Sequence, residues 1–196
     1  FPRLRTGREP APHCQECRDW PAGLRAARSA CLLRPPADAL VHQLKYRGWH
    51  RLGELMADRM AAIRLPPDAA TETRIIVPVP TTPVRRRERG YNQAEVLGRA
   101  LAEATGRTVI CGLRRRVGAS SQIALQPAAR LANVAGAFGL VAGAQQELAG
   151  EHLLLVDDVL TTGATVVACA RTLVDSGARC VSVLTFARAT GRFRLE

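Results

Sequence analysis

Short aliphatic runs alternate along the chain with segments whose apolar residues recur every three or four positions. Five of these runs have the length and composition of buried β-strands: residues 74–79, 108–111, 137–141, 153–156 and 180–186. The period of 3.6 residues between the runs indicates amphipathic helices. The alternation of the two patterns predicts an α/β fold with a parallel sheet flanked by helices.

Residues typical of helix ends mark three of the expected helices. Asp38 is a plausible N-cap for a helical region that Gly48 interrupts. Asn92 followed by Glu95 resembles a capping box, and its helix is expected to end at Gly106. Apolar spacing over residues 166–174 predicts another helix directly after the fourth aliphatic run.

The first 35 residues differ in composition from the rest of the chain. Prolines at positions 2, 10, 12, 21, 35 and 36 break regular structure there, although residues 29–33 have a strand-like pattern. We therefore expect a short irregular head over residues 1–35 and one α/β domain over residues 36–196.

Two carboxylates and a turn of small residues follow the aliphatic run at residues 153–156. The carboxylates are Asp157 and Asp158, and the turn consists of Thr161, Thr162, Gly163, Ala164 and Thr165. Carboxylates accept hydrogen bonds from sugar hydroxyls, and the start of a helix favours phosphate. Ligands of open α/β sheets bind beyond the carboxyl ends of strands. The run predicts a site for a phosphorylated sugar; the alternative is a βα turn with acidic caps.

This segment resembles the phosphoribosyl diphosphate (PRPP) signature of type I phosphoribosyltransferases. Three further blocks resemble the ComF family, whose phosphoribosyltransferase-like members are associated with competence and DNA use. These blocks are residues 77–80 (VPVP) with 89–93 (RGYNQ), residues 44–46 (LKY), and Gln126, Arg130 and Asn133 with residues 136–138 (GAF). Together with the signature, the matching blocks span residues 38–188.

The resemblance implies that the protein binds PRPP with Mg²⁺ and transfers its phosphoribosyl group to a nitrogen acceptor with release of diphosphate. Asp157 and Asp158 would orient the ribose, and residues 161–165 would hold the 5′-phosphate. Residues 117–127 have the polarity and glycine content of a lid. The expected diphosphate contacts are Thr81, Thr82, Arg85, Arg89 and Arg130. The acceptor is not specified, so DNA uptake and nucleotide salvage both stay open.

The net charge of +11 favours polyanionic partners without specifying one. An alternative function is therefore a non-catalytic module that binds single-stranded DNA or a protein of the competence and recombination machinery and retains a PRPP pocket. Tyr91 and Trp49 are the candidates for base stacking, but only 4% of the residues are aromatic, which argues against this alternative. Lys45, the sole lysine, is interpreted as an exposed helical residue, and the alternative is that an ammonium charge is required at this position. No histidine is assigned a role.

Cys14 and Cys17 have the spacing of half a zinc ribbon. ComF-family proteins often begin with a four-cysteine zinc site, but a second such pair is missing here, so two free thiols are the alternative. The six cysteines indicate no disulfide framework, which favours a reduced cytoplasm. The sequence has no apolar run of about 18 residues and no signal-peptide pattern after Phe1, and we expect no membrane span.

Overall fold

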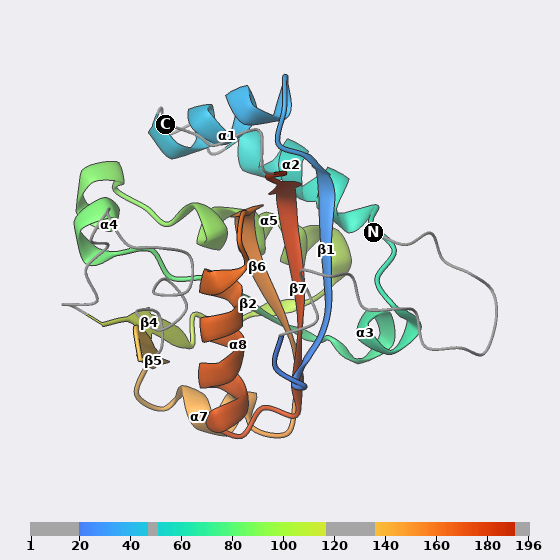
Figure 1. Cartoon of the computed structure of the whole chain (residues 1–196), viewed down its shortest axis with the longest axis vertical. Coiled ribbons are helices and arrows are strands. Elements are labelled where there is room, and N and C mark those ends of the chain that lie inside the picture. The colour runs from blue at the N-terminus through green and yellow to red at the C-terminus, as the bar shows by residue number, and fades with distance from the viewer. Residues whose placement is uncertain (1–19, 47–50, 117–135, 191–196) are drawn as a thin grey trace.

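A five-stranded parallel sheet forms the centre of the molecule (Figure 1). The computed structural model describes residues 20–46, 51–116 and 136–190. Across the sheet the strands follow the order β1 (Leu24–Leu32), β7 (Cys180–Arg188), β6 (His152–Leu160), β2 (Ile75–Pro78) and β3 (Thr108–Val109). Every neighbouring pair in this sheet is parallel. The predicted α/β fold with a parallel sheet flanked by helices is confirmed.

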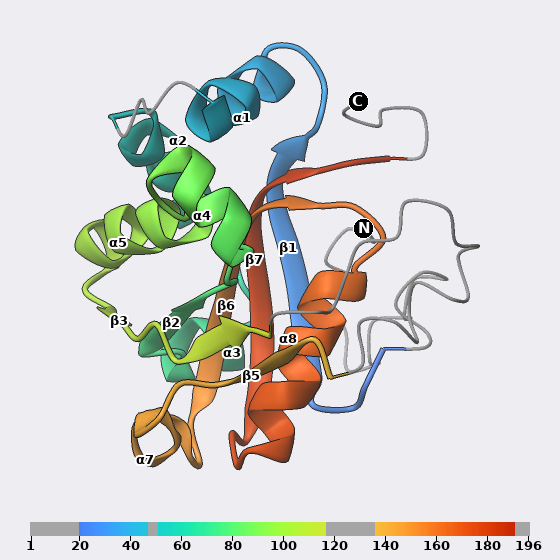
Figure 2. The ribbon, with the colours of Figure 1, turned by 90° about the vertical axis from the view of Figure 1, so that its left-hand side faces the viewer.

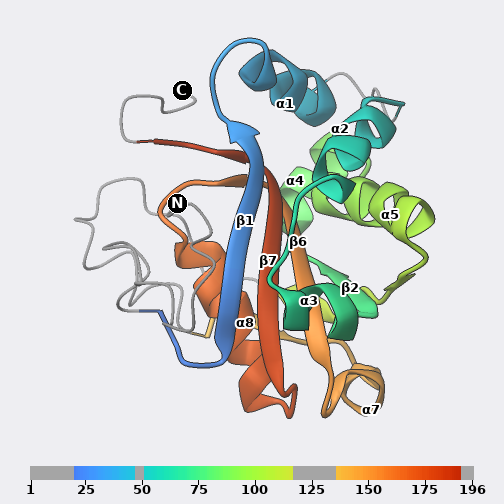
Figure 3. The ribbon, with the colours of Figure 1, turned by 90° about the vertical axis from the view of Figure 1, so that its right-hand side faces the viewer.

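Helices cover both faces of the sheet (Figures 2 and 3). One face packs against α2 (Arg51–Ala61) and α5 (Gln93–Thr105), with α1 (Ala37–Tyr46) at the end where β1, β6 and β7 terminate. The other face packs against α8 (Ala164–Asp175). Three short helices lie around the sheet: α3 (Pro67–Glu72), α4 (Pro83–Arg89) and α7 (Ala144–Leu148).

Strand β6 is buried on both faces, which explains why its sequence is apolar without alternation. Leu153 and Leu155 belong to the core on the α8 side, whereas Leu154 and Val156 belong to the core on the α2 and α5 side. All four side chains have no exposed surface. Because successive residues of a strand point to opposite faces, a strand covered by helices on both sides must be apolar throughout.

Two expectations about strands are wrong in part. The expected irregular head ends earlier than residue 35, since Leu24–Leu32 forms β1 and pairs in parallel with β7 along most of its length. The run at residues 137–141 does not join the main sheet. Its strand β5 (Phe138–Leu140) pairs antiparallel with β4 (Leu113–Arg115) in a separate ribbon. A short apolar run specifies a strand but not the partner with which it pairs.

The C-terminal cap of α5 agrees with the sequence prediction, whereas the N-terminal cap differs from it. Gly106 follows the last residue with φ of 67°, a left-handed cap as predicted. Asn92 occupies the N-cap position, but its side chain makes no cap hydrogen bond. Its Nδ2 donates instead to the carbonyl of Val79 at 2.9 Å, so Asn92 fixes the connection from β2 to α5. The predicted capping box is therefore wrong.

Candidate functional site

The acid pair lies at the point where the sheet changes its direction of growth. From β2 the chain continues outward to β3, whereas β6 continues to β7 on the opposite side. β2 ends at Pro78, which pairs with Val156, so β6 extends past it with Asp157 and Asp158. Such a switch point in an open α/β sheet is where a ligand crevice is expected. The sequence indicated that the two aspartates follow the end of the strand, but the structure shows that they belong to β6 itself.

Asp157 and Asp158 interact with each other in a poorly solvated environment. The backbone N–H of Asp158 donates to Oδ1 of Asp157 at 2.8 Å. Burial raises the pKa of the Asp157 carboxyl well above its usual range, and the charge of Asp158 raises it further. The hydrogen bond from the Asp158 N–H and the charge of Lys45 lower this pKa. A carboxyl whose pKa is raised by burial and by a neighbouring carboxylate is typical of a functional site.

Asp158 is paired with a cation and still has acceptor capacity. Asp158 is 7% exposed, and the Nζ of Lys45 lies 3.1 Å from Oδ2 of Asp158. That distance makes an ion pair, but among the described residues no donor meets Oδ2 in hydrogen-bond geometry. A buried carboxylate oxygen of this kind is suited to accept a hydrogen bond from a ligand hydroxyl.

The turn at residues 161–165 leads directly into α8. Gly163 has φ of 81° and serves as the N-cap, and the helix runs for 12 residues from Ala164. Because the first N–H groups of a helix have no acceptor within it, this end is suited to bind a phosphate. Arg188 donates to the carbonyl of Thr161 at 2.6 Å and fixes the start of the turn. Thr161 and Thr162 are exposed, and Thr165 is partly exposed.

The segment after β2 forms a short helix, and not only the loop that the sequence predicted. Thr82 is the N-cap of α4, and its hydroxyl accepts from the N–H of Arg85 at 3.2 Å. The hydroxyl of Thr82 and this N–H therefore bond to each other. Thr81 and Arg89 are partly exposed, and Arg85 and Arg87 are exposed, so these side chains stay available to an anion, whereas Arg86 lies 3.5 Å from Glu95 in an ion pair.

Arg89 and Tyr46 join α4 to the end of α1. The guanidinium of Arg89 lies 5.0 Å from the centroid of the Tyr46 ring, and its Nη2 lies 3.5 Å from the Tyr46 hydroxyl. Tyr91 is partly buried and its hydroxyl donates to the carbonyl of Leu44. Together these contacts hold the end of α1 above the carboxyl ends of the strands (Figure 1).

Arg115 is a site residue that the sequence analysis missed. It lies at the end of β4, with its guanidinium 5.3 Å from the centroid of the Phe138 ring. The charges of Asp157 and Arg85 both act on the pKa of Arg115, so Arg115 lies within electrostatic range of the acid pair and of α4. Burial lowers the pKa of its guanidinium, and its Nε has no hydrogen-bond partner among the described residues. The only sequence signal for Arg115 was its place in a run of three arginines, residues 114–116, before a polar segment.

Other predicted site residues lie outside the described residues. They include Arg130, the expected lid at residues 117–127, Trp49, and the zinc half-site of Cys14 and Cys17. Within residues 20–46, 51–116 and 136–190, no group of three or more His, Cys, Asp or Glu side chains is arranged to hold a metal. The described cysteines, Cys31, Cys111, Cys169 and Cys180, are all free thiols.

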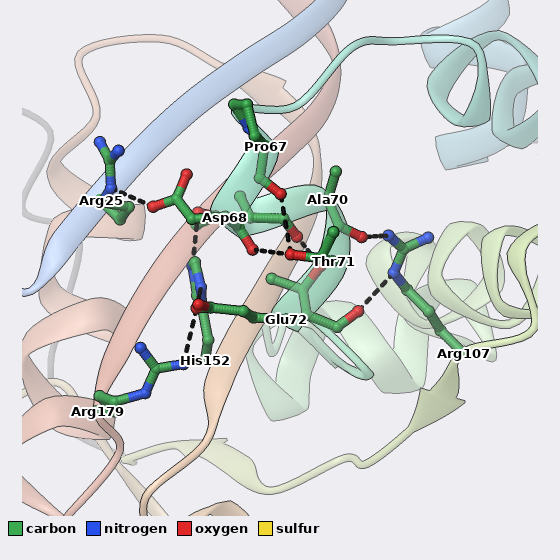
Figure 4. Close-up of polar contacts among 12 residues, drawn as sticks. Arg25, Pro67, Asp68, Ala70, Thr71, Glu72, Arg107, His152 and Arg179 are labelled. Carbon is green, nitrogen blue, oxygen red and sulfur yellow. Dashed lines mark hydrogen bonds and ion pairs between the residues drawn. The ribbon is translucent and has the colours of Figure 1, made fainter.

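A second polar cluster lies near the opposite ends of β6 and β7. It is a chain of contacts through Ser182, His152, Glu72 and Arg179. His152 places Nδ1 3.0 Å from Oε2 of Glu72 and Nε2 2.9 Å from the hydroxyl of Ser182. Figure 4 shows Glu72 between His152 and Arg179, whose Nη2 donates to Glu72 at 2.8 Å. The order serine, histidine, carboxylate is that of a hydrolase triad. However, Ser182 is 0% exposed, so the cluster is structural.

The parallel sheet, the acid pair at its switch point and the turn before α8 define an α/β protein with a candidate ligand site at the carboxyl ends of its strands. The DNA utilization protein YhgH of Salmonella typhimurium is 32% identical over 194 residues, which cover 91% of this chain and 81% of the relative. Competence protein F of Haemophilus influenzae is 34% identical over 115 residues, or 58% and 50% of the two chains. The chain belongs to the family of these proteins, the ComF family that its sequence blocks resemble.

The solved structures similar to this chain share part of its arrangement. They include the glutamine PRPP amidotransferase of B. subtilis complexed with ADP and GMP, with a TM-score of 0.43 and 21% identity. The similarity covers 74% of this chain but spans only 26% of that enzyme. No family model matches the chain. Among the described residues, no helix has the length and hydrophobicity that crossing a membrane requires.

Proposed function

We propose that the protein binds PRPP and transfers its phosphoribosyl group to a nitrogen acceptor, with diphosphate as the leaving group. The observation that carries the proposal is the acid pair at the switch point of the sheet. Asp157 and Asp158 are held together beside a helix that begins in a turn of small residues. A ribose 5-phosphate needs this combination of hydroxyl acceptors and phosphate donors, whereas a βα turn with acidic caps leaves the burial of Asp158 unexplained.

Each part of the site has a role in this reaction. The carboxylates accept hydrogen bonds from the ribose hydroxyls and stabilise the positive charge that develops at C1 as its bond to diphosphate breaks. The N–H groups at the start of α8 and the hydroxyls of Thr161, Thr162 and Thr165 hold the 5′-phosphate. Arg115, with Arg85 and Arg89 of α4, receives the departing diphosphate, because guanidinium groups match phosphate oxygens. Thr81, at the start of the segment that leads to α4, and Arg130 complete the proposed contacts.

Mg²⁺ would enter with the diphosphate of PRPP and neutralise part of its charge. The described residues fit this arrangement, because their acidic groups form a pair and no cage of three ligands. Binding and orientation therefore fall to the protein, and acid–base chemistry is secondary. We place this activity in the cytoplasm, where PRPP and reduced thiols coexist, and we leave the acceptor open.

Calorimetric titration with Mg²⁺ and PRPP tests the proposal. We expect saturable binding by the native protein and loss of that binding when Asp157→Asn and Asp158→Asn are combined. The control is Asp58→Asn, which removes an exposed carboxylate on α2. Binding that is unchanged in the double variant, or absent from the native protein, would overturn the proposal.

One observation favours a second candidate, a module that binds single-stranded DNA. Tyr46 is 63% exposed and lies beside Arg89 and the exposed arginines of α4. It replaces Tyr91, whose hydroxyl is occupied, as the candidate for base stacking. The names of the relatives, DNA utilization protein and competence protein, agree with such a role.

Fluorescence anisotropy with an oligonucleotide at increasing salt tests this candidate. A dedicated site predicts that Tyr46→Ala weakens binding by about five- to a hundredfold, or about 1 to 3 kcal/mol per stacked base, at high salt as well as low. Affinity that depends on salt alone and is unaffected by Tyr46→Ala would indicate unspecific attraction to phosphate.

A further inference from the structure

Lys45 is the one lysine in a chain with 28 basic residues. Its sequence position indicates an exposed helical side chain, but the structure places it elsewhere. Only 20% of the Lys45 side chain is exposed, and its Nζ lies 3.1 Å from Oδ2 of Asp158, whose side chain is 10% exposed. The interpretation of Lys45 as a solvated helical residue is therefore wrong. An ammonium is held against the acid pair from α1, a helix far from β6 in the sequence.

Several contacts fix the segment that carries Lys45. Leu44, the residue before it, has no exposed surface, and its carbonyl accepts the hydroxyl of Tyr91. Tyr46, the residue after it, is held by the guanidinium of Arg89. Since both neighbours are anchored, the Lys45 side chain has little freedom to leave the acid pair.

The titratable groups of the acid pair and around it come from four elements. Lys45 comes from α1, Arg115 from β4 and the Cys169 thiol from α8, while the two carboxylates belong to β6. Burial and the charge of Asp158 raise the pKa of the Asp157 carboxyl and so favour a proton on it, and the charge of Lys45 opposes this. A protonated carboxyl is a donor and a poorer acceptor, and would compete with the ribose hydroxyls for hydrogen-bonding sites.

We propose that Lys45 is a positioning residue that keeps the acid pair ionised and thereby ready to accept the ribose hydroxyls. This inference rests on the proposed function. A lysine suits the task better than an arginine, because its compact charge neutralises Oδ2 without a planar fork that saturates both oxygens. In agreement, Oδ2 of Asp158 has no donor in hydrogen-bond geometry among the described residues.

The first test measures ionisation without any ligand. Carbon-13 NMR follows the side-chain carboxyls of Asp157 and Asp158 across pH in the native protein, Lys45→Met and Lys45→Arg. We expect Lys45→Met to move the titration of the pair to higher pH and Lys45→Arg to keep it near that of the native protein. The matched control, Arg25→Met, removes the cation that pairs with Asp68 near the opposite end of the sheet. A titration of the acid pair that is the same in all variants would overturn the inference.

The second test measures PRPP binding against pH by calorimetry. In Lys45→Met we expect affinity to fall more between pH 8 and pH 6 than in the native protein, by up to about tenfold for each unit by which the pKa of the pair rises. In Lys45→Arg the profile should keep its native midpoint even if affinity falls at every pH. A uniform loss in Lys45→Met, with no change in midpoint, would assign Lys45 a structural role and refute the inference.

The two tests separate failure of the inference from failure of the proposed function. If the native protein does not bind PRPP, the proposed function fails, while the NMR titration still decides whether Lys45 controls ionisation. If Lys45→Met does not fold, acetylation of the folded native protein neutralises its single lysine and reductive methylation retains the charge. The acetylated and methylated proteins then replace the two variants, with the same expected results.

Discussion

The indole of Trp20 lies directly over Gly163, the residue that precedes α8. A Cβ placed on Gly163 would lie 2.9 Å from Cζ2 of Trp20, which is closer than real carbon contacts. Gly163 also has φ of 81°, a conformation that other residues rarely adopt. Both the backbone and the packing therefore require glycine at the proposed phosphate turn.

Gly163→Ala should destabilise the protein and weaken PRPP binding. The left-handed backbone alone costs about 1 to 2 kcal/mol, and the contact with Trp20 adds to it. The control is Gly106→Ala, which has φ of 67° but open space around its Cβ. Urea unfolding measures both variants, and we expect the larger loss of stability for Gly163→Ala. Equal losses would show that Trp20 gives way. In a protein that already carries Trp20→Ala, the additional loss caused by Gly163→Ala should fall to the level of Gly106→Ala.

Asp157→Asn should raise the stability of the protein at neutral pH while it abolishes PRPP binding. Burial raises the pKa of this carboxyl, so its ionisation as pH rises above the unfolded value of about 4 opposes folding, a cost that Lys45 offsets only in part. Asparagine removes this cost. We expect a rise in Tm of a few degrees at pH 7 that disappears below about pH 4, because about 1 kcal/mol corresponds to 2 to 4 °C in a chain of this size.

Calorimetric unfolding scans between pH 3 and pH 8 measure this effect, with Asp58→Asn on the exposed face of α2 as the control. A Tm for Asp157→Asn at or below that of the native protein at pH 7 would contradict the destabilising role of the carboxylate. The gain in stability also ensures that loss of PRPP binding in this variant is not a result of unfolding.

Arg115→Ala should weaken PRPP binding by about ten- to a hundredfold, since a hydrogen bond to a charged group contributes about 1.5 to 3 kcal/mol. The matched control is Arg114→Ala on the same strand, because Arg114 is exposed and its Nε donates to the carbonyl of Leu140 at 3.0 Å. We expect that control to bind within about twofold of the native protein. Calorimetry measures the affinity of both variants for PRPP, and similar affinities would remove Arg115 from the proposed site.

His152→Leu should lower stability without changing the affinity for PRPP. The variant removes the contacts with Glu72 and Ser182 and leaves a buried hydroxyl without its histidine partner, at a cost of about 2 to 3 kcal/mol. Adding Ser182→Ala should recover part of this loss, since the hydroxyl is then absent. Urea unfolding of the single and double variants gives the coupling energy between the two residues, and a double variant no more stable than His152→Leu would contradict this account.

The fold class could be predicted because its signals are local. Four aliphatics in a row at residues 153–156 indicate a strand buried on both faces, and the structure shows that strand in the centre of the sheet. The strand at residues 137–141 shows the limit of such signals. Its apolar run is as clear as the others, yet it pairs with β4 in a separate ribbon, because pairing depends on which segments meet in space.

The site was predictable to the same extent. Asp157, Asp158 and the turn at residues 161–165 are adjacent in the sequence, so their chemistry is visible as one motif. Lys45 and Arg115 carry no such pattern, and they reach the acid pair only through the packing of α1 and β4. Asn92 illustrates the same limit, since its side chain bonds to Val79 and not within its own helix.

The sequence by itself determined the alternation of strands and helices, the acid pair and the glycine turn, because hydrophobic period, charge and backbone freedom are properties of neighbouring residues. The tertiary structure alone decided that Leu24–Leu32 is an edge strand, that a lysine of α1 lies against Asp158, and that the acids stand at the switch point of the sheet. These relationships join segments far apart in the chain, and only the packing of helices on a parallel sheet brings them together.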